Sequence, residues 1–119
     1  MGYERKLYIV NKTSVKFEIE EKQYAEIIAF YNMSKFNAFD GIFTKETDCF
    51  IYADDGNTQI LKDKYGDALK ESTITEVIEC LEKFKEAQEN YRRVQPLLSL
   101  LKGFNLDEWE NLVVLHYGY

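Results

Sequence analysis

Residues 73–95 carry the pattern that most constrains the fold, because apolar side chains recur there at intervals of three and four residues. The members of this stripe are Ile74, Val77, Ile78, Leu81, Phe84, Ala87 and Tyr91. This spacing places apolar side chains on one face of an α-helix, and that face has to pack against another element. Thr73 and Glu76 have the spacing of a capping box, which marks a helix start. We therefore expect one long helix over Thr73–Gln95 with one buried face.

Pro96 limits the length of this helix. Proline disfavours helical geometry at the preceding residue, so the helix either ends at Gln95 or kinks into a second segment with Pro96 in its first turn. That second segment ends at Lys102 and Gly103, a C-terminal signature. Its leucines cover more than one helix face, so some of them should be buried by a partner chain. We expect a homodimer interface that contains Tyr91, Leu97, Leu98 and Leu101.

The remainder of the chain has mostly the alternation of strands. Glu4–Val10 and Ser14–Glu20 each alternate apolar and polar residues, and the polar stretch between them predicts a hairpin turn. Cys49–Ala53 and Thr58–Leu61 predict a second hairpin around a turn at Asp54, Asp55, Gly56 and Asn57. Tyr65, Gly66 and Asp67 predict a further turn, and Leu112–Tyr119 predicts a closing strand.

Tyr24–Met33 fits two structures. Its spacing suits a helix, but its β-branched and aromatic content slightly favours a buried strand. Taken together, the patterns predict an α+β fold: a mainly antiparallel sheet of about five strands, with one long helix and one shorter helix packed on one face. The length of 119 residues and the absence of a linker-like stretch predict a single domain over residues 1–119.

Composition excludes several kinds of function. The net charge of −6 argues against direct nucleic-acid binding, because phosphate-binding domains usually have a basic surplus. No apolar run is long enough to span a membrane, and the charged first ten residues do not resemble a signal peptide, so we expect a cytoplasmic protein. One histidine, His116, two dispersed cysteines, Cys49 and Cys80, and isolated glycines predict no catalytic, metal or cofactor site.

Acidic and aromatic residues are the best candidates for a binding site. The acidic surplus lies mainly in residues 36–72, with eight acidic and four basic side chains, so its turns can steer a basic partner. Tyrosine supplies a large contact area with a polar tip, which suits an anchor at an interface. We expect Asp54 and Asp55 to steer a partner, and Tyr52, Tyr65 and Tyr117 to anchor it. The tyrosines expected to share one sheet face are Tyr3, Tyr8, Tyr52, Tyr65, Tyr117 and Tyr119.

Three strings resemble a group of known proteins: residues 7–10 (LYIV), 50–57 (FIYADDGN) and 114–118 (VLHYG). Together with the bias towards Lys, Asn, Ile and Tyr, they resemble small uncharacterised proteins of phages and prophages of AT-rich Gram-positive bacteria. The resemblance implies a bacterial host cell and a protein that binds and blocks a host factor, such as a CRISPR nuclease or another defence protein. It implies no catalytic motif.

The resulting prediction is a non-catalytic protein-binding protein, a phage-type inhibitor or modulator of a host protein. Two alternatives stay open. One is a small-ligand or enzymatic domain with a site assembled from dispersed residues, for which His116, Asp54 and Tyr52 are candidates. The other is a structural subunit of a phage complex.

Overall fold

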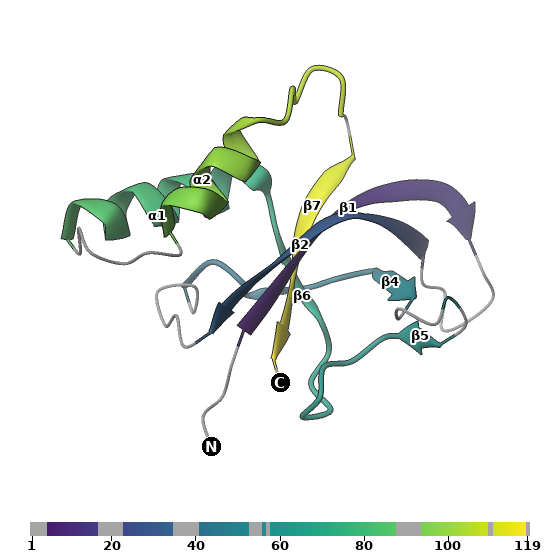
Figure 1. The fold of residues 1–119 in the computed structure, drawn as a ribbon. Coiled ribbons are helices and arrows are strands. Elements are labelled where there is room, and N and C mark those ends of the chain that lie inside the picture. Colours follow the sequence, from purple (N-terminus) through teal and green to yellow (C-terminus); the bar gives the residue numbers. More distant parts are fainter. Residues whose placement is uncertain are drawn as a thin grey trace.

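The fold is a curled sheet with two helices on one side of it (Figure 1). The structure, a computed structural model, describes residues 5–16, 23–34, 41–52, 56, 58–87, 94–109 and 111–118. In chain order the elements are β1 (Arg5–Lys16), β2 (Gln23–Ser34), β3 (Lys45–Glu46), β4 (Cys49–Tyr52), β5 (Gln59–Ile60), β6 (Lys70–Ser72), α1 (Ile74–Ala87), α2 (Val94–Lys102) and β7 (Leu112–Gly118).

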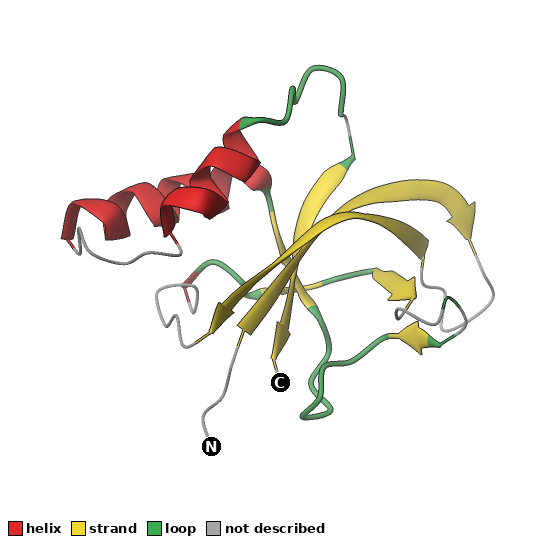
Figure 2. Ribbon diagram, viewed as in Figure 1, coloured by secondary structure: helices red, strands yellow, loops and turns green. Residues whose placement is uncertain are grey.

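The strands form a mixed sheet, in the order β3-β6-β7-β1-β2-β4-β5. Neighbours run antiparallel except β2 and β4, which are parallel. The predicted fold, an open sheet of about five strands with one long helix packed on it, is therefore wrong. The chain forms a seven-stranded half-barrel with two short helices, and more of its residues lie in strands than in helices (Figure 2).

The predicted hairpin between Glu4–Val10 and Ser14–Glu20 is also wrong, because this part of the chain pairs with a strand further along the sequence. Arg5–Lys16 is one continuous strand, and Asn11 and Lys12 pair with Glu26 and Ala25 of β2 instead of turning. Cross-strand pairing with a second long strand outweighs the local turn preference of polar residues. Tyr24–Met33, whose pattern suited either a helix or a strand, lies in β2, so the preference for a strand is confirmed. The β4–β5 hairpin and the closing strand β7 are confirmed as well.

The sheet curls because one short segment pairs with strands far apart in the order. Only Thr47 and Asp48 separate β3 from β4, although β3 is the first strand of the sheet and β4 lies next to the far end. The Thr47 amide donates to the Leu69 carbonyl at 2.9 Å, and the Gln23 amide donates to the Asp48 carbonyl at 2.9 Å. Residues 45–52 therefore connect the β6 side to the β2 side and hold the sheet in a half-barrel.

Thr73 caps the first helix as predicted. Its hydroxyl oxygen accepts a hydrogen bond from the Glu76 amide at 3.0 Å and donates one to the Glu76 carboxylate at 3.1 Å. The helix does not extend to Gln95, however, because Gln95 lies in the first turn of α2 together with Pro96. Proline fits there since the first-turn amides have no partner inside the helix.

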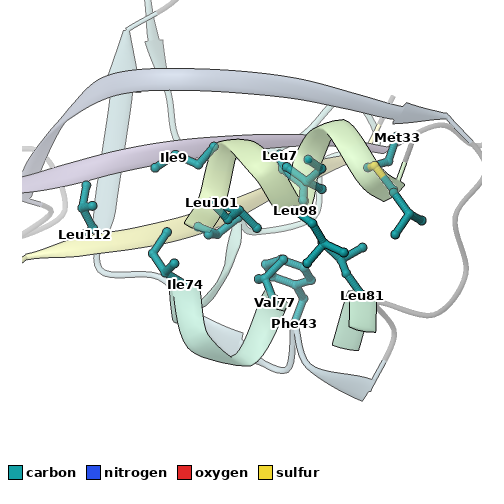
Figure 3. Close-up of a cluster of buried hydrophobic side chains, with 13 residues drawn as sticks. Leu7, Ile9, Met33, Phe43, Ile74, Val77, Leu81, Leu98, Leu101 and Leu112 are labelled. Carbon is teal, nitrogen blue, oxygen red and sulfur yellow. The ribbon is translucent and has the colours of Figure 1, made fainter. Parts of the chain in front are cut away.

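The helix-facing core lies between the two helices and one face of β1, β2 and β7 (Figure 3). Its buried members are Leu7, Ile9, Met33, Phe43, Ile74, Val77, Leu81, Val94, Leu97, Leu98, Leu101, Leu112 and Val114. The leucines proposed for a homodimer interface, Leu97, Leu98 and Leu101, are at most 2% exposed here. Their burial within one chain removes the reason for placing them at an interface, while Tyr91 lies outside the described residues.

A second cluster fills the inside of the half-barrel. It comprises Val10, Ala25, Cys49, Ile51, Leu69 and Leu115. Side chains alternate between these two clusters along β7, where Val114 faces the helices and Leu115 faces inward. None of the helices that the structure describes is long and apolar enough to cross a membrane.

We predict that Leu98→Ala lowers the free energy of unfolding by about 2–5 kcal/mol, because it removes a buried leucine and leaves a cavity. Leu106→Ala is the matched control: Leu106 is 43% exposed, so its truncation should change stability by less than about 0.5 kcal/mol. Urea unfolding measures both. Equal small losses for the two variants would contradict the packing of α2 on the sheet.

Candidate functional site

Three aromatic rings form a continuous surface across three neighbouring strands. Tyr8 of β1 lies directly opposite Phe30 of β2, with ring centroids 6.3 Å apart, and its ring meets that of Tyr117 of β7 edge-on at 6.2 Å. Tyr8 and Tyr117 also pack on the inner cluster, so the surface lies on the sheet face away from the helices. Phe30 is 60% exposed, which makes it the most exposed large apolar side chain that the structure describes.

Lys6 brings a positive charge to these rings. Its Nζ lies 5.3 Å from the centroid of Phe30 and 5.6 Å from that of Tyr8. Each contact of this kind is worth about 0.5–1 kcal/mol at an exposed site. Burial, with smaller contributions from Tyr8 and Asp63, raises the pKa of Tyr117 above its ordinary value. We call Lys6, Tyr8, Phe30 and Tyr117 the aromatic surface.

The structure places two of the predicted anchors at this end of β7. Tyr117 is part of the aromatic surface, and Tyr65 lies in a turn whose Lys64 amide donates to the Gly118 carbonyl at 3.0 Å. Tyr65 is 54% exposed, and Gly66 after it has a positive φ of 83°, which confirms the predicted turn. Two exposed or half-exposed aromatic positions thus flank the end of one strand.

A third predicted anchor lies elsewhere. Tyr52 belongs to a separate aromatic group on β2 and β4, with its ring centroid 5.3 Å from Tyr24 and 5.7 Å from Phe50. Asp54 and Asp55 lie outside the described residues. The expectation that these tyrosines share one sheet face therefore fails for Tyr52.

The sequence does not predict the exposure of Phe30, because its apolar run favours a buried strand and because a β-bulge changes the alternation of β2. Ile9 and Val10 of β1 are adjacent, but they pair with Ala29 and Ile27, which leaves Ile28 as an extra residue. Ile28 and Ala29 consequently both pack on the helix-facing core, and Phe30 turns to the opposite face. A strict two-residue period from Ile27 would have placed Phe30 on the helix side.

An ionic cluster lies where the sheet curls. Lys12 Nζ of β1 donates to Asp48 at 3.0 Å and to both carboxylate oxygens of Glu71 at 3.2 and 3.4 Å. Thr47 donates to the same Glu71 carboxylate at 3.0 Å, and Lys45 Nζ lies 3.8 Å from it. Glu71 is 7% exposed, so these contacts compensate for the removal of its charge from water.

The pKa shifts in this cluster disfavour nucleophilic chemistry. Burial lowers the pKa of Lys12, but its contacts with Asp48, Cys49 and Glu71 outweigh burial and raise it overall, so the amine stays protonated. The hydrogen bond from Lys12 lowers the pKa of Asp48. Burial raises the pKa of the Cys49 thiol to about 11, so little thiolate exists at neutral pH. We interpret the ionic cluster as a brace of the half-barrel.

His116 lies on the other face of the sheet from Cys49. It pairs with Leu7 of the helix-facing core and is 8% exposed, and its ring centroid lies 5.3 Å from that of Phe43. Its Nε2 is 3.3 Å from Arg5 Nη1. A guanidinium only donates, so Nε2 accepts and the imidazole is neutral in this contact. A Cys49–His116 pair therefore does not form.

One surface pocket of about 510 Å³ lies beside α1. It is lined by Ile42, Glu76, Glu79, Cys80, Lys83 and Phe84. Burial raises the pKa of the Cys80 thiol, so this thiol also lacks the activation that a nucleophile needs. Among the described residues, no three or more His, Cys, Asp or Glu side chains are grouped as a metal site would require.

Comparison with known proteins gives no relative. No protein family, no curated protein and no solved structure matches this chain.

We predict that Lys12→Met costs about 3 kcal/mol of unfolding free energy, because it leaves the buried Glu71 carboxylate without its main cation. The double variant Lys12→Met/Glu71→Leu should recover at least half of that loss. Lys102→Met, which breaks the exposed pair of Lys102 and Glu82, should cost at most about 1 kcal/mol. Urea unfolding of the four proteins tests this, and similar losses for Lys12→Met and Lys102→Met would contradict the brace.

We also predict that Cys49 resists thiol reagents in the folded chain. In Cys80→Ser, where Cys49 is the only thiol, Ellman's reagent at pH 8 should react at least about 100-fold more slowly with native than with guanidine-unfolded protein, because a pKa of about 11 reduces the thiolate fraction about 100-fold. Cys49→Ser, which retains only the half-buried Cys80, should show a smaller difference. Equal rates for native and unfolded Cys80→Ser would contradict the burial of Cys49.

Proposed function

We propose that this chain is a non-catalytic protein-binding domain that recognises its partner through the aromatic surface. The observation that carries the proposal is the 60% exposure of Phe30 next to Tyr8, with Lys6 over both rings. Large aromatic side chains with an adjacent cation are typical of the centres of protein interfaces. An exposed phenylalanine would gain about 2 kcal/mol or more from burial by a partner.

The ionisable groups support binding over catalysis. Each described cysteine has a raised pKa, Lys12 is held as an ammonium, and His116 faces Arg5 on the helix side of the sheet. The alternative site of His116, Asp54 and Tyr52 gains no support, because His116 and Tyr52 belong to different aromatic contacts.

The phage resemblance extends this proposal in two ways. The partner is a host protein, and binding inhibits it. The net charge of −6 supports a partner with a basic surface. A negatively charged chain associates with such a surface faster than a neutral chain would. Nucleic-acid-binding host proteins have such surfaces.

The test compares two exposed apolar residues of the same chain. Tagged wild-type protein, Phe30→Ala and Leu106→Ala are used to capture proteins from a bacterial lysate, and the captured proteins are quantified by mass spectrometry. A partner that binds the aromatic surface should be recovered at least about tenfold less with Phe30→Ala and equally with Leu106→Ala. Recovery that is unchanged by Phe30→Ala would rule out this surface as the binding site.

A further inference from the structure

Half of the outer edge of β2 pairs with no strand that the structure describes. β2 pairs with β1 from Gln23 to Ser34, whereas on its other side β4 pairs only with Gln23 and Tyr24. From Ala25 to Phe30 no strand that the structure describes pairs with this side. In an antiparallel strand about half of the backbone N–H and C=O groups point to each side, so this stretch presents a row of hydrogen-bonding groups outward.

This edge has few of the features by which proteins prevent unwanted pairing. Short strands, lysine, proline and bulges are the usual protections of an edge. The terminal strands β3 and β5 have two residues each, and β3 begins with a lysine. Ala25–Phe30 (AEIIAF) instead has no lysine or proline, and only Glu26 and the bulge at Ile28 interrupt it.

We propose that the partner protein contributes an extended strand that pairs with the outer edge of β2 beside Phe30. This inference rests on the proposed function and names the form of the ligand: a β-strand that extends the sheet. Backbone hydrogen bonds would supply affinity, and the alternating side chains of the added strand would supply specificity.

Charge favours a strand from another protein over a second copy of β2. Antiparallel pairing of two β2 strands centred between Ile28 and Ala29 would keep opposite residues on one face, with Ile27 opposite Phe30 and Glu26 opposite Tyr31. That register leaves Glu26 without an opposite cation, because β2 (Gln23–Ser34) contains no lysine or arginine. A strand from another protein can supply one, and it can pair with the bulged β2 as β1 does.

Charge and apolar area specify the side chains of that strand. On the inner face it would lie against the exposed Phe30 ring, which suits valine, isoleucine or an aromatic residue. On the helix-side face it would lie near Glu26, which is exposed and is the one charged residue of the stretch, so a lysine or arginine is the complementary residue. The expected ligand is an alternating apolar strand with one cation.

The probe is a nine-residue peptide of alternating threonine and valine with a central lysine and blocked ends. We expect NMR titration to perturb β2, and roughly every second amide of Ala25–Phe30 to exchange with deuterium at least about tenfold more slowly when the peptide is bound. The internal strand β7 serves as the reference, because both of its edges are already paired. No binding at millimolar peptide, or perturbation confined to the α1 pocket, would overturn the proposal.

Two matched pairs test the mode of binding. The same peptide N-methylated at two adjacent central residues, which removes an N–H from each of its edges, should bind at least about tenfold more weakly. Replacing the peptide lysine with glutamate should weaken binding to the wild type, and Glu26→Lys should reverse that preference. Equal binding of parent and N-methylated peptides, or protection of the β2 amides by self-association of the chain alone, would refute strand addition.

The two proposals fail in different ways. If Phe30→Ala loses the captured partner but N-methylation has no effect on the peptide, the aromatic surface stands and strand addition is wrong. If Phe30→Ala retains every captured partner, the proposed function itself is wrong, whatever the peptide does.

Discussion

The contact between Lys12 and Glu71 joins parts of the chain that the sheet must bring together in order to curl. Glu71 comes from β6, Lys12 from β1, and Asp48 from the two-residue link between β3 and β4. A flat sheet would leave β3 and β4 at distant positions, which two linking residues cannot span. Residues 45–52 therefore impose the curvature, and the buried carboxylate with its ammonium partner holds the strands at that point. The inner cluster of Val10, Cys49 and Leu115 fills the space that the curvature encloses.

Short sequence patterns correctly predicted the elements that depend only on residues close together in the chain. The capping box at Thr73, the β4–β5 hairpin, the turn before Gly66 and the closing strand each depend on a few neighbouring residues, and the structure contains all of them. The sheet order and curvature could not be predicted, because they depend on which distant strands pair. Asn11 shows the limit: its polar neighbours favour a turn, but pairing with Glu26 makes it part of a long strand.

Of the described residues expected to form a binding site, the fold brings only some together, and again the reason is pairing. Tyr117 and Tyr65 are brought near one another by the fold, at the end of β7, while Tyr52 was assigned to the same face without knowledge of the β2–β4 contact. The leucines of α2 were misinterpreted because helix periodicity shows how many faces are apolar but does not show how many neighbours will cover them. Leu97 and Leu98 are covered by α1 and the sheet.

The bulge at Ile28 connects the core to the surface. It lets β2 give two successive residues, Ile28 and Ala29, to the helix-facing core, and the shift in alternation then sends Tyr31 and Met33 to that core and Phe30 to the opposite face. Without it, Phe30 would point towards the helices and Tyr31 away from them. The same extra residue that completes the packing under α1 and α2 thus exposes a phenylalanine beside Tyr8 and Lys6. One local irregularity therefore determines both how β2 fills the helix-facing core and which large apolar side chain it exposes on the opposite face.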